Sequence, residues 1–413
     1  MTLSMPNTSD AAVSGCPVPQ QFPSNTDDRP FRIYDHEFST DPHRMYEKMR
    51  RRGGSLVPIE LERGVPATLV IGYHTAVRIL HDPNHFPADP RAWQKTIAPD
   101  CPILPMMEWQ PCARNSTGSE HERYRRASVD SINGVDLHAL HGIVEDIAAP
   151  LISAFEGDAT AELVKQYAFP LVFAVLNRMI GCPDDVAIRI AQGMRARFDS
   201  EADAGKAMDV LDAALSELVE LKHEFPGDDI TTRLIAHQAK LDDRETKAQV
   251  MSLYAAGVEA QRNLIINTLL LMMTDQDLGA GLLSGSMTTR DALDRVLFND
   301  PPMANFCVTY PRQPILIDNT WLPANQPVVI SLAACNNDPQ VVGGDRTGNR
   351  SHLAWSVGPH ACPANRIAYL VAQDAVDQLL DVVPQIALRV APSELQWRPG
   401  PFHRALVALP VKL

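Results

Sequence analysis

The stretch "WSVGPHACPANRIA", residues 355–368, sets Cys362 between a Gly-Pro-His run and a segment with helical spacing. Gly358 and Pro359 predict a constrained turn. Pro363 stands where the first turn of a helix accepts proline, because the missing N–H would have no partner there. The free N–H groups and the dipole at a helix start favour a thiolate over a thiol. We therefore expect the Cys362 sulfur to lie at a helix N-terminus as a thiolate.

The other cysteines have no comparable setting. They form no CxxC or CxxH pair that would indicate zinc or a redox dithiol. In a reducing compartment such residues are mostly small, buried apolar side chains. We expect most of the six to be structural, Cys112 and Cys307 among them; the six are Cys16, Cys101, Cys112, Cys182, Cys307 and Cys335.

Composition and charge exclude several classes of protein. The chain has 413 residues, 45% of them hydrophobic, with 37 Lys and Arg against 50 Asp and Glu, a net charge of −13. An acidic surface disfavours nucleic acid and anionic membranes as partners. No basic and apolar leader opens the chain, and the strongly apolar run at 263–275 is too short to span a bilayer. The sequence predicts a cytoplasmic protein that binds neither nucleic acid nor membrane.

Hydrophobic periodicity predicts a mainly α fold. Apolar residues recur every three or four positions along most of the chain. Hairpins are predicted at 55–73 and 314–333, and edge strands at 388–390 and 404–413. The absence of βαβ alternation argues against a Rossmann or barrel enzyme. We expect a disordered lead-in over residues 1–30 and one mainly α domain with small β-sheets over 31–413.

The loop around Cys362 resembles the haem-ligand loop of the cytochrome P450 superfamily, matched here by Trp355, Gly358, His360 and Cys362. Four other segments resemble family segments and follow in the family's order: "HERYRRASV" (121–129), "YAAGVEAQRN" (254–263), "LPANQPVVISLAACNNDP" (322–339) and "HLAW" (352–355). This resemblance identifies the chain as an atypical, soluble bacterial member. It implies the single-domain P450 fold and haem b as the cofactor.

The resemblance also implies roles for individual residues. Cys362 would be the axial thiolate ligand of the haem iron, with Trp355 beside it in the loop. His121 and Arg125, at i and i+4, would lie on one helical face and bind a haem propionate. The implied propionate contacts are His121, Arg125, His352 and His360.

The central segment departs from the family pattern. Members usually carry an acid followed by an alcohol, which relay protons on the oxygen side of the haem. Glu259 supplies the acid, but Ala260 and Gln261 stand where threonines are expected. We expect the usual relay to be broken. Because burying Glu259 unpaired would cost free energy, we also expect it to be hydrogen-bonded or functional.

A second departure precedes "DPP" at 300–302. The family's Glu-x-x-Arg pair is replaced by Arg295 and Phe298, so its salt bridge cannot form. Arg346 is a candidate for the surviving arginine of the following meander, with Asp294 as a partner. Two glycines of the ligand loop are also replaced, by Ser356 and Ala364.

These losses beside an intact ligand loop favour an oxidative reaction that needs little from the proton relay. Some bacterial members of the family couple aromatic rings of tryptophan- or tyrosine-containing peptides, often cyclic dipeptides. We therefore expect oxidative C–C or C–N coupling of a small aromatic substrate. The alternatives are a conventional monooxygenase that hydroxylates a small apolar natural product, a non-catalytic haem binder, and a helical scaffold with a structural cysteine.

Substrate contacts follow from where the family's variable segments fall: residues 102–114, the helix face at 256, 260 and 261, the run 303–308 and the turn 400–404. The candidate substrate contacts, which would fit an ordinary core equally well, are Met106, Trp109, Ala256, Phe306 and Phe402. The chain has no G-x-G-x-x-G or P-loop pattern, so its electrons must come from a separate protein. The resemblance implies a ferredoxin and an NADPH-dependent ferredoxin reductase, with Arg123 and Arg126 as candidate docking residues.

Overall fold

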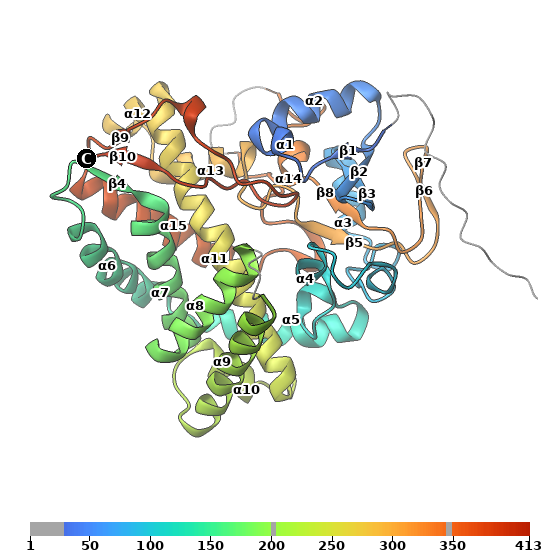
Figure 1. Ribbon diagram of the computed structural model, residues 1–413, viewed down its shortest axis with the longest axis horizontal. Coiled ribbons are helices and arrows are strands. Elements are labelled where there is room, and N and C mark those ends of the chain that lie inside the picture. Colours follow the sequence, from blue (N-terminus) through green and yellow to red (C-terminus); the bar gives the residue numbers. More distant parts are fainter. Residues whose placement is uncertain (1–28, 200–203, 344–348) are drawn as a thin grey trace, which may run out of the picture.

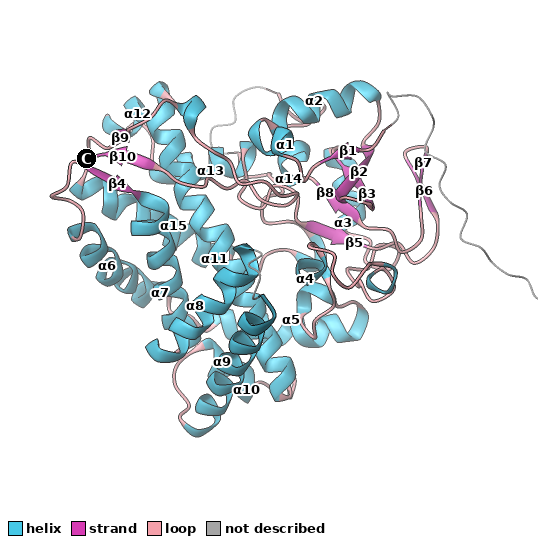
Figure 2. Cartoon of the chain, in the orientation of Figure 1, coloured by secondary structure: helices cyan, strands magenta, loops and turns pink. Residues whose placement is uncertain are grey.

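The structure, a computed structural model, describes residues 29–199, 204–343 and 349–413. All but the last two positions of the predicted lead-in, residues 1–30, lie outside the described residues. Helices dominate the described chain, and short strands gather in small sheets near its periphery (Figure 2). The predicted mainly α, single-domain fold with small β-sheets is confirmed. In the described part of the chain, no helix combines the length and apolar character needed to cross a bilayer.

The helices follow the predicted apolar periodicity. They are α1 (His36–Thr40), α2 (Pro42–Arg52), α3 (Tyr73–Leu80), α4 (Leu104–Met107), α5 (Gly118–Asn133), α6 (Leu137–Ser153), α7 (Phe169–Ile180), α8 (Asp184–Asp199), α9 (Ala204–Glu224), α10 (Ile230–Ala236), α11 (Asp243–Thr274), α12 (Gln276–Leu283), α13 (Thr289–Asn299), α14 (Leu332–Asn336) and α15 (Asn365–Val382).

The longest helix, α11, organises the molecule. Its 32 residues span about 48 Å at 1.5 Å per residue. A capping box starts it: the Asp242 carboxylate accepts the Glu245 N–H at 2.7 Å, and the Glu245 carboxylate accepts the Asp242 N–H at 3.0 Å. Figure 1 shows α11 crossing the middle of the molecule. It packs against α7, α13 and α15 in the larger hydrophobic core.

The strands form three separate sheets. They are β1 (Phe31–Arg32), β2 (Leu56–Glu62), β3 (Val65–Val70), β4 (Thr160–Glu162), β5 (Cys307–Thr309), β6 (Ile315–Ile317), β7 (Thr320–Leu322), β8 (Val328–Ile330), β9 (Ala387–Leu388) and β10 (Pro410–Lys412). The sheet orders are β1-β2-β3-β8-β5, β4-β10-β9 and β6-β7. The largest sheet covers a second core together with α1 and α2.

Both predicted hairpins form, but the second predicted stretch, residues 314–333, also contributes a strand to the main sheet. The pair β6–β7 turns through Asp318 and Asn319, which both have positive φ, a conformation that Asp and Asn tolerate. The rest of the stretch leaves the hairpin, and β8 joins the main sheet parallel to β3. The prediction of a C-terminal edge strand is wrong for β10, because β10 pairs on both sides, with β4 and β9.

Candidate functional site

The Cys362 loop lies between a single 3-10 turn (Gly358–His360) and α15. The Cys362 N–H donates to the Trp355 carbonyl at 2.8 Å, which closes the loop. Gly358 has φ +75°, and a Cβ there would lie 2.3 Å from the Leu80 carbonyl oxygen. Only glycine fits both the left-handed backbone and this close approach. Ser356 also has a positive φ, 56°, which is uncommon for a residue with a Cβ.

Two details of the loop correct the sequence prediction. Pro363 is not in the first turn of a helix, because α15 starts at Asn365 with Ala364 as its N-cap. Burial raises the pKa of the Cys362 thiol, while the Ala364 N–H and the charge of Arg125 act in the opposite direction. The Ala364 N–H at the helix start thus lowers the pKa and favours the thiolate, as predicted, but burial outweighs it in the protein alone. A coordinated metal ion would deprotonate the thiol.

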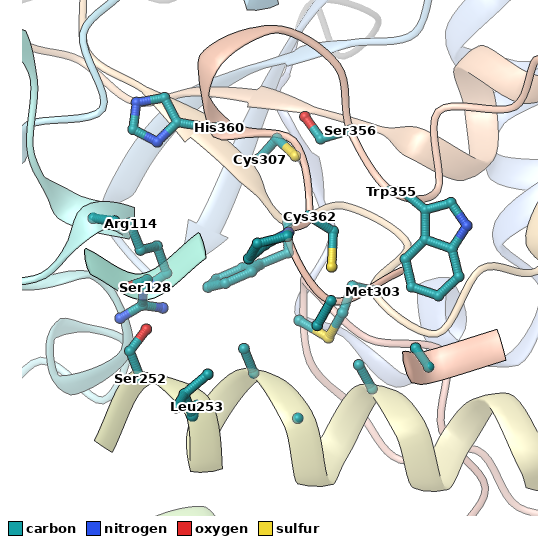
Figure 3. Close-up of a pocket in the computed structure, with 18 of the residues that line it drawn as sticks. Arg114, Ser128, Ser252, Leu253, Met303, Cys307, Trp355, Ser356, His360 and Cys362 are labelled. Carbon is teal, nitrogen blue, oxygen red and sulfur yellow. The ribbon is translucent and has the colours of Figure 1, made fainter. Parts of the chain in front are cut away.

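The Cys362 sulfur projects into a cavity of about 390 Å³ between the ligand loop and α11 (Figure 3). Ala256 and Ala260 of α11 line this cavity, and Trp355 lines it on the Cys362 side. Most of the wall is apolar. The loop therefore presents a thiol across an apolar cavity from a helix with small side chains.

A basic cluster without a described carboxylate partner lies at the edge of this cavity. Arg125 lines it, and the His121 and His360 rings lie next to each other, tilted by 39° with their centroids 4.1 Å apart. Burial lowers the pKa of Arg125, and burial and the neighbouring His121 and Arg125 lower the pKa of His360 to about 3. His121 Nε2 is buried without a hydrogen-bond partner among the described residues. This cluster can bind the carboxylates of a ligand in the cavity.

The fourth predicted propionate contact, His352, is not brought to the cavity. Its Nδ1 accepts the Ala354 N–H at 3.3 Å, and its Nε2 lies 3.4 Å from the Tyr369 hydroxyl. Its ring packs edge-on against Phe298, with the centroids 5.1 Å apart. His352 therefore does not line the cavity that Arg125 and His360 line.

The three central-helix candidates face in different directions. Ala260 and Gln261 line the cavity, whereas Glu259 does not. The Gln261 amide donates to the Ala368 carbonyl at 2.9 Å, which ties α11 to α15.

The carboxylate of Glu259 is held in an ion-pair network. It accepts hydrogen bonds from Arg262 at 2.8 Å, from Asn263 at 2.9 Å and from Arg398 of the C-terminal loop. Although burial opposes ionisation, Arg262 and Arg398 hold the pKa of Glu259 below its ordinary value. Glu259 is thus an anion fixed behind the cavity wall.

The predicted substrate contacts divide into two groups. Met106, Ala256 and Phe306 line the cavity. Phe402 does not, and packs behind Phe306 with the ring centroids 5.0 Å apart. Trp109 does not line it either and lies against the Arg91 guanidinium, 5.1 Å from its ring centroid.

Sequence reasoning missed several lining residues. Arg114, Ser252, Met303 and Cys307 all line the cavity. Arg114 is the last residue of the segment 102–114, and Met303 and Cys307 belong to the run 303–308. Both segments contain predicted substrate contacts, so the sequence indicated the segments but not these residues. Cys307, for which a structural role is expected, lines the cavity beside the Cys362 loop (Figure 3).

Arg295 and Phe298, which replace the Glu-x-x-Arg pair, have separate partners. Arg295 forms an ion pair with Asp275 at 3.0 Å, and Phe298 packs on His352. The residue before Arg295 is the one that reaches the ligand-loop region.

That residue is Asp294. It accepts a 2.5 Å hydrogen bond from Tyr369 of α15 and forms an ion pair with Arg350 at 3.1 Å. Arg346, the predicted partner, lies outside the described residues. Within the described chain, Asp294 therefore joins α13 to α15 and to the segment just before the ligand loop.

Comparison with known proteins identifies the family. No family model matches the chain. The cytochrome P450 monooxygenase PikC of Streptomyces venezuelae is 28% identical over 393 residues, which cover 91% of this chain and 92% of PikC. The 2-hydroxy-5-methyl-1-naphthoate 7-hydroxylase of Streptomyces carzinostaticus is 24% identical, covering 93% of this chain and 97% of that protein.

Solved structures agree on the fold. CYP154A1 from Streptomyces coelicolor A3(2) superposes with a TM-score of 0.83 at 22% identity, covering 93% of this chain and 100% of CYP154A1. The tirandamycin C-bound P450 monooxygenase TamI gives 0.83 at 25% identity, covering 93% and 100%. The chain belongs to the cytochrome P450 superfamily, and its cofactor is haem b. The thiol, the apolar cavity and the unpaired basic cluster all fit that group.

The close approach at Gly358 gives a testable prediction. Gly358→Ala should destabilise the protein by about 2–4 kcal/mol, through left-handed strain and overlap with the Leu80 carbonyl. Gly64→Ala is the matched control, because Gly64 has φ +76° but no atom within 4 Å of the position that a Cβ would occupy. It should cost about 1 kcal/mol. Denaturant unfolding measures both, and equal losses would show that the Leu80 contact is unimportant.

Proposed function

We propose that this member of the family catalyses oxidative C–C or C–N coupling of an aromatic substrate derived from tryptophan or tyrosine, such as a cyclic dipeptide. One observation carries the proposal. Between residues 256 and 264, the described α11 side chains that line the cavity include neither an acid nor an alcohol. The wall there has Ala260 and an amide, Gln261, that is already bonded to Ala368.

In this proposal, Cys362 ligates the haem iron, and Arg125, His121 and His360 bind the propionates. Arg125 supplies the positive charge, because burial lowers the pKa of both histidines and disfavours their charged forms. Neutral rings can still donate one N–H each. Bound haem supplies the capacity to oxidise the substrate one electron at a time with dioxygen.

The reaction balances without oxygen insertion. Each new bond removes two hydrogen atoms from the substrate. These two electrons and two protons, with two more of each from outside, reduce one dioxygen to two waters. Hydroxylation instead leaves one oxygen atom in the product, and only one water forms.

The side chains of α11 suit the first outcome. Ala260 can neither donate nor accept a hydrogen bond, and the Gln261 amide is not an acid. Glu259 remains ionised between Arg262 and Arg398 and does not line the cavity. Protons would therefore reach the cavity through water and not through a positioned acid and alcohol. Coupling needs a one-electron oxidant more than it needs controlled oxygen transfer.

The proposed electron donors are a ferredoxin and an NADPH-dependent ferredoxin reductase. Of the two candidate docking residues, Arg126 is exposed at a groove next to Arg125. Arg123 is already used within the chain, since its guanidinium donates to both Glu245 oxygens, at 2.6 and 2.7 Å, and to backbone carbonyls. Arg126 is therefore the better candidate.

Hydroxylation is the second candidate function, because the relatives named above are a monooxygenase and a hydroxylase of an aromatic acid. Reconstitution with a ferredoxin, its reductase and aromatic cyclic dipeptides distinguishes the two. Coupling gives a product two hydrogen atoms lighter than its reactants. Hydroxylation adds the mass of one oxygen. If no tested substrate is consumed, the cyclic-dipeptide class is contradicted, and a haem binder without turnover is favoured.

Restoring the missing hydroxyl gives a further prediction. Ala260→Thr should not increase native turnover, because coupling does not use the hydroxyl, and it should divert part of the product to oxygenated compounds. Ala256→Thr, one turn earlier on the same wall, controls for added bulk. A several-fold faster native reaction in Ala260→Thr alone would indicate an ordinary hydroxylase.

A further inference from the structure

A largely buried arginine, Arg114, lines the cavity from the short turn at Ala113–Asn115. Its Nε is buried without a hydrogen-bond partner, and its terminal nitrogen makes only a long contact, 3.4 Å, to the Met106 carbonyl. Its guanidinium lies 5.5 Å from the Phe306 ring centroid. Among the described residues, no carboxylate forms an ion pair with it. Arg114 thus brings unused donors to the cavity.

The backbone just before Arg114 is fixed by Gln249 of α11. The Gln249 amide nitrogen donates to the Pro111 carbonyl at 3.0 Å, and its oxygen accepts the Ala113 N–H at 3.4 Å. The same oxygen accepts the Ser128 hydroxyl at 3.0 Å. Because Gln249 is buried, this clamp holds the arginine in place before any ligand binds.

Two hydroxyls accompany the guanidinium. Ser128 of α5 and Ser252 of α11 line the cavity, and Figure 3 shows them on the same side of the cavity as Arg114. The Cys362 sulfur lies toward the middle of that view. One end of an otherwise apolar cavity is therefore polar.

Arg114 is separate from the basic cluster proposed for the haem propionates. Arg125 and His360 line both the cavity and the adjoining groove, whereas Arg114 lines the cavity alone. Its neighbours Met106 and Phe306 belong to the predicted substrate wall. These contacts favour substrate over haem as its ligand.

We propose that Arg114 is a substrate-binding residue that donates hydrogen bonds to a carbonyl-type oxygen of the substrate. A guanidinium has five donors and no acceptor, and leaving it buried without acceptors costs free energy. The matching group accepts without donating, as does the amide oxygen of a cyclic dipeptide or the carboxylate of an amino-acid derivative. Anchored there, the substrate extends its aromatic part along the apolar wall toward Cys362. This inference rests on the proposed aromatic substrate but not on the coupling reaction.

The test is a binding titration of the haem-loaded protein with three indole probes. These are cyclo(Trp-Trp), with amide oxygens; indole-3-propanoate, with a carboxylate; and 3-propylindole, with no oxygen. Binding is followed by the change in haem absorption and by equilibrium dialysis. At least one oxygen-bearing probe should bind more tightly than 3-propylindole, and the order of the two separates an amide from a carboxylate site.

Removing the guanidinium should abolish this preference. Arg114→Met should weaken the preferred probe by roughly ten- to a hundredfold, the effect of one charge-assisted hydrogen bond, and leave 3-propylindole unchanged. Arg189→Met, at an arginine paired with Glu217 away from the cavity, should change neither.

Three results would overturn the assignment: no preference for an oxygen-bearing probe in the wild type, an unchanged preference in Arg114→Met, or a parallel loss of haem that places Arg114 at a propionate. The coupling proposal fails separately, through an oxygen atom in the product.

Discussion

Cys362→Ala should abolish the long-wavelength absorption of the reduced carbon-monoxide complex, together with all turnover. A Cys362 thiolate would hold the haem iron and donate electron density to it, and alanine provides no ligand. The Trp355 carbonyl holds the Cys362 backbone, and the Ala364 N–H contacts the Cys362 sulfur. Because alanine has no sulfur, the second contact is lost, and some haem loss is also expected. Absorption spectra of the purified variant, with haem content measured in parallel, test this result.

The cavity offers a matched control in Cys307. Its thiol lines the same cavity, and burial raises its pKa to about 11. Cys307→Ala should keep the thiolate spectrum, because Cys307 is on β5 and not in the ligand loop. A normal thiolate spectrum in Cys362→Ala, or loss of that spectrum in Cys307→Ala, would show that Cys362 is not the iron ligand.

Arg125→Ala should weaken haem binding by roughly ten- to a hundredfold, corresponding to one charge-assisted hydrogen bond in a desolvated site. Arg125 is the charged member of the cluster with His121 and His360, and its described surroundings offer no carboxylate. Haem transfer to an acceptor protein measures the loss.

Arg126→Ala is the control for Arg125, since Arg126 is the next residue on α5 but is exposed and does not line the cavity. It should retain haem as the wild type does and lose affinity for the ferredoxin instead. Full haem retention in Arg125→Ala after gel filtration would make Arg125 a surface residue without a role at the propionates.

Features encoded by neighbouring residues were predictable from the sequence. The ligand loop, the β2–β3 hairpin and the long helix α11 depend on local turn residues, alternation and helical spacing. Boundaries were less predictable. Pro363 fits the first turn of a helix by its local chemistry, yet the loop continues to Ala364 because the Cys362 backbone is held by Trp355.

Side-chain partners distant in sequence could not be predicted. Glu259 could be expected to need a partner, but Arg398 is 139 residues away. His352 was placed at the propionates by family order, yet it contacts Tyr369 and Phe298 and does not line the cavity. Which members of an apolar segment face a cavity depends on tertiary packing, so Phe306 lines it while Phe402 is buried behind it.

The most direct test of the central claim is product analysis under isotopically labelled dioxygen. The haem-loaded protein, supplied with a ferredoxin, its reductase and an aromatic cyclic dipeptide, should give a coupled product that has lost two hydrogen atoms per bond and carries no label. All label should appear in water. One labelled oxygen in the main product would contradict oxidative coupling and make this protein a hydroxylase.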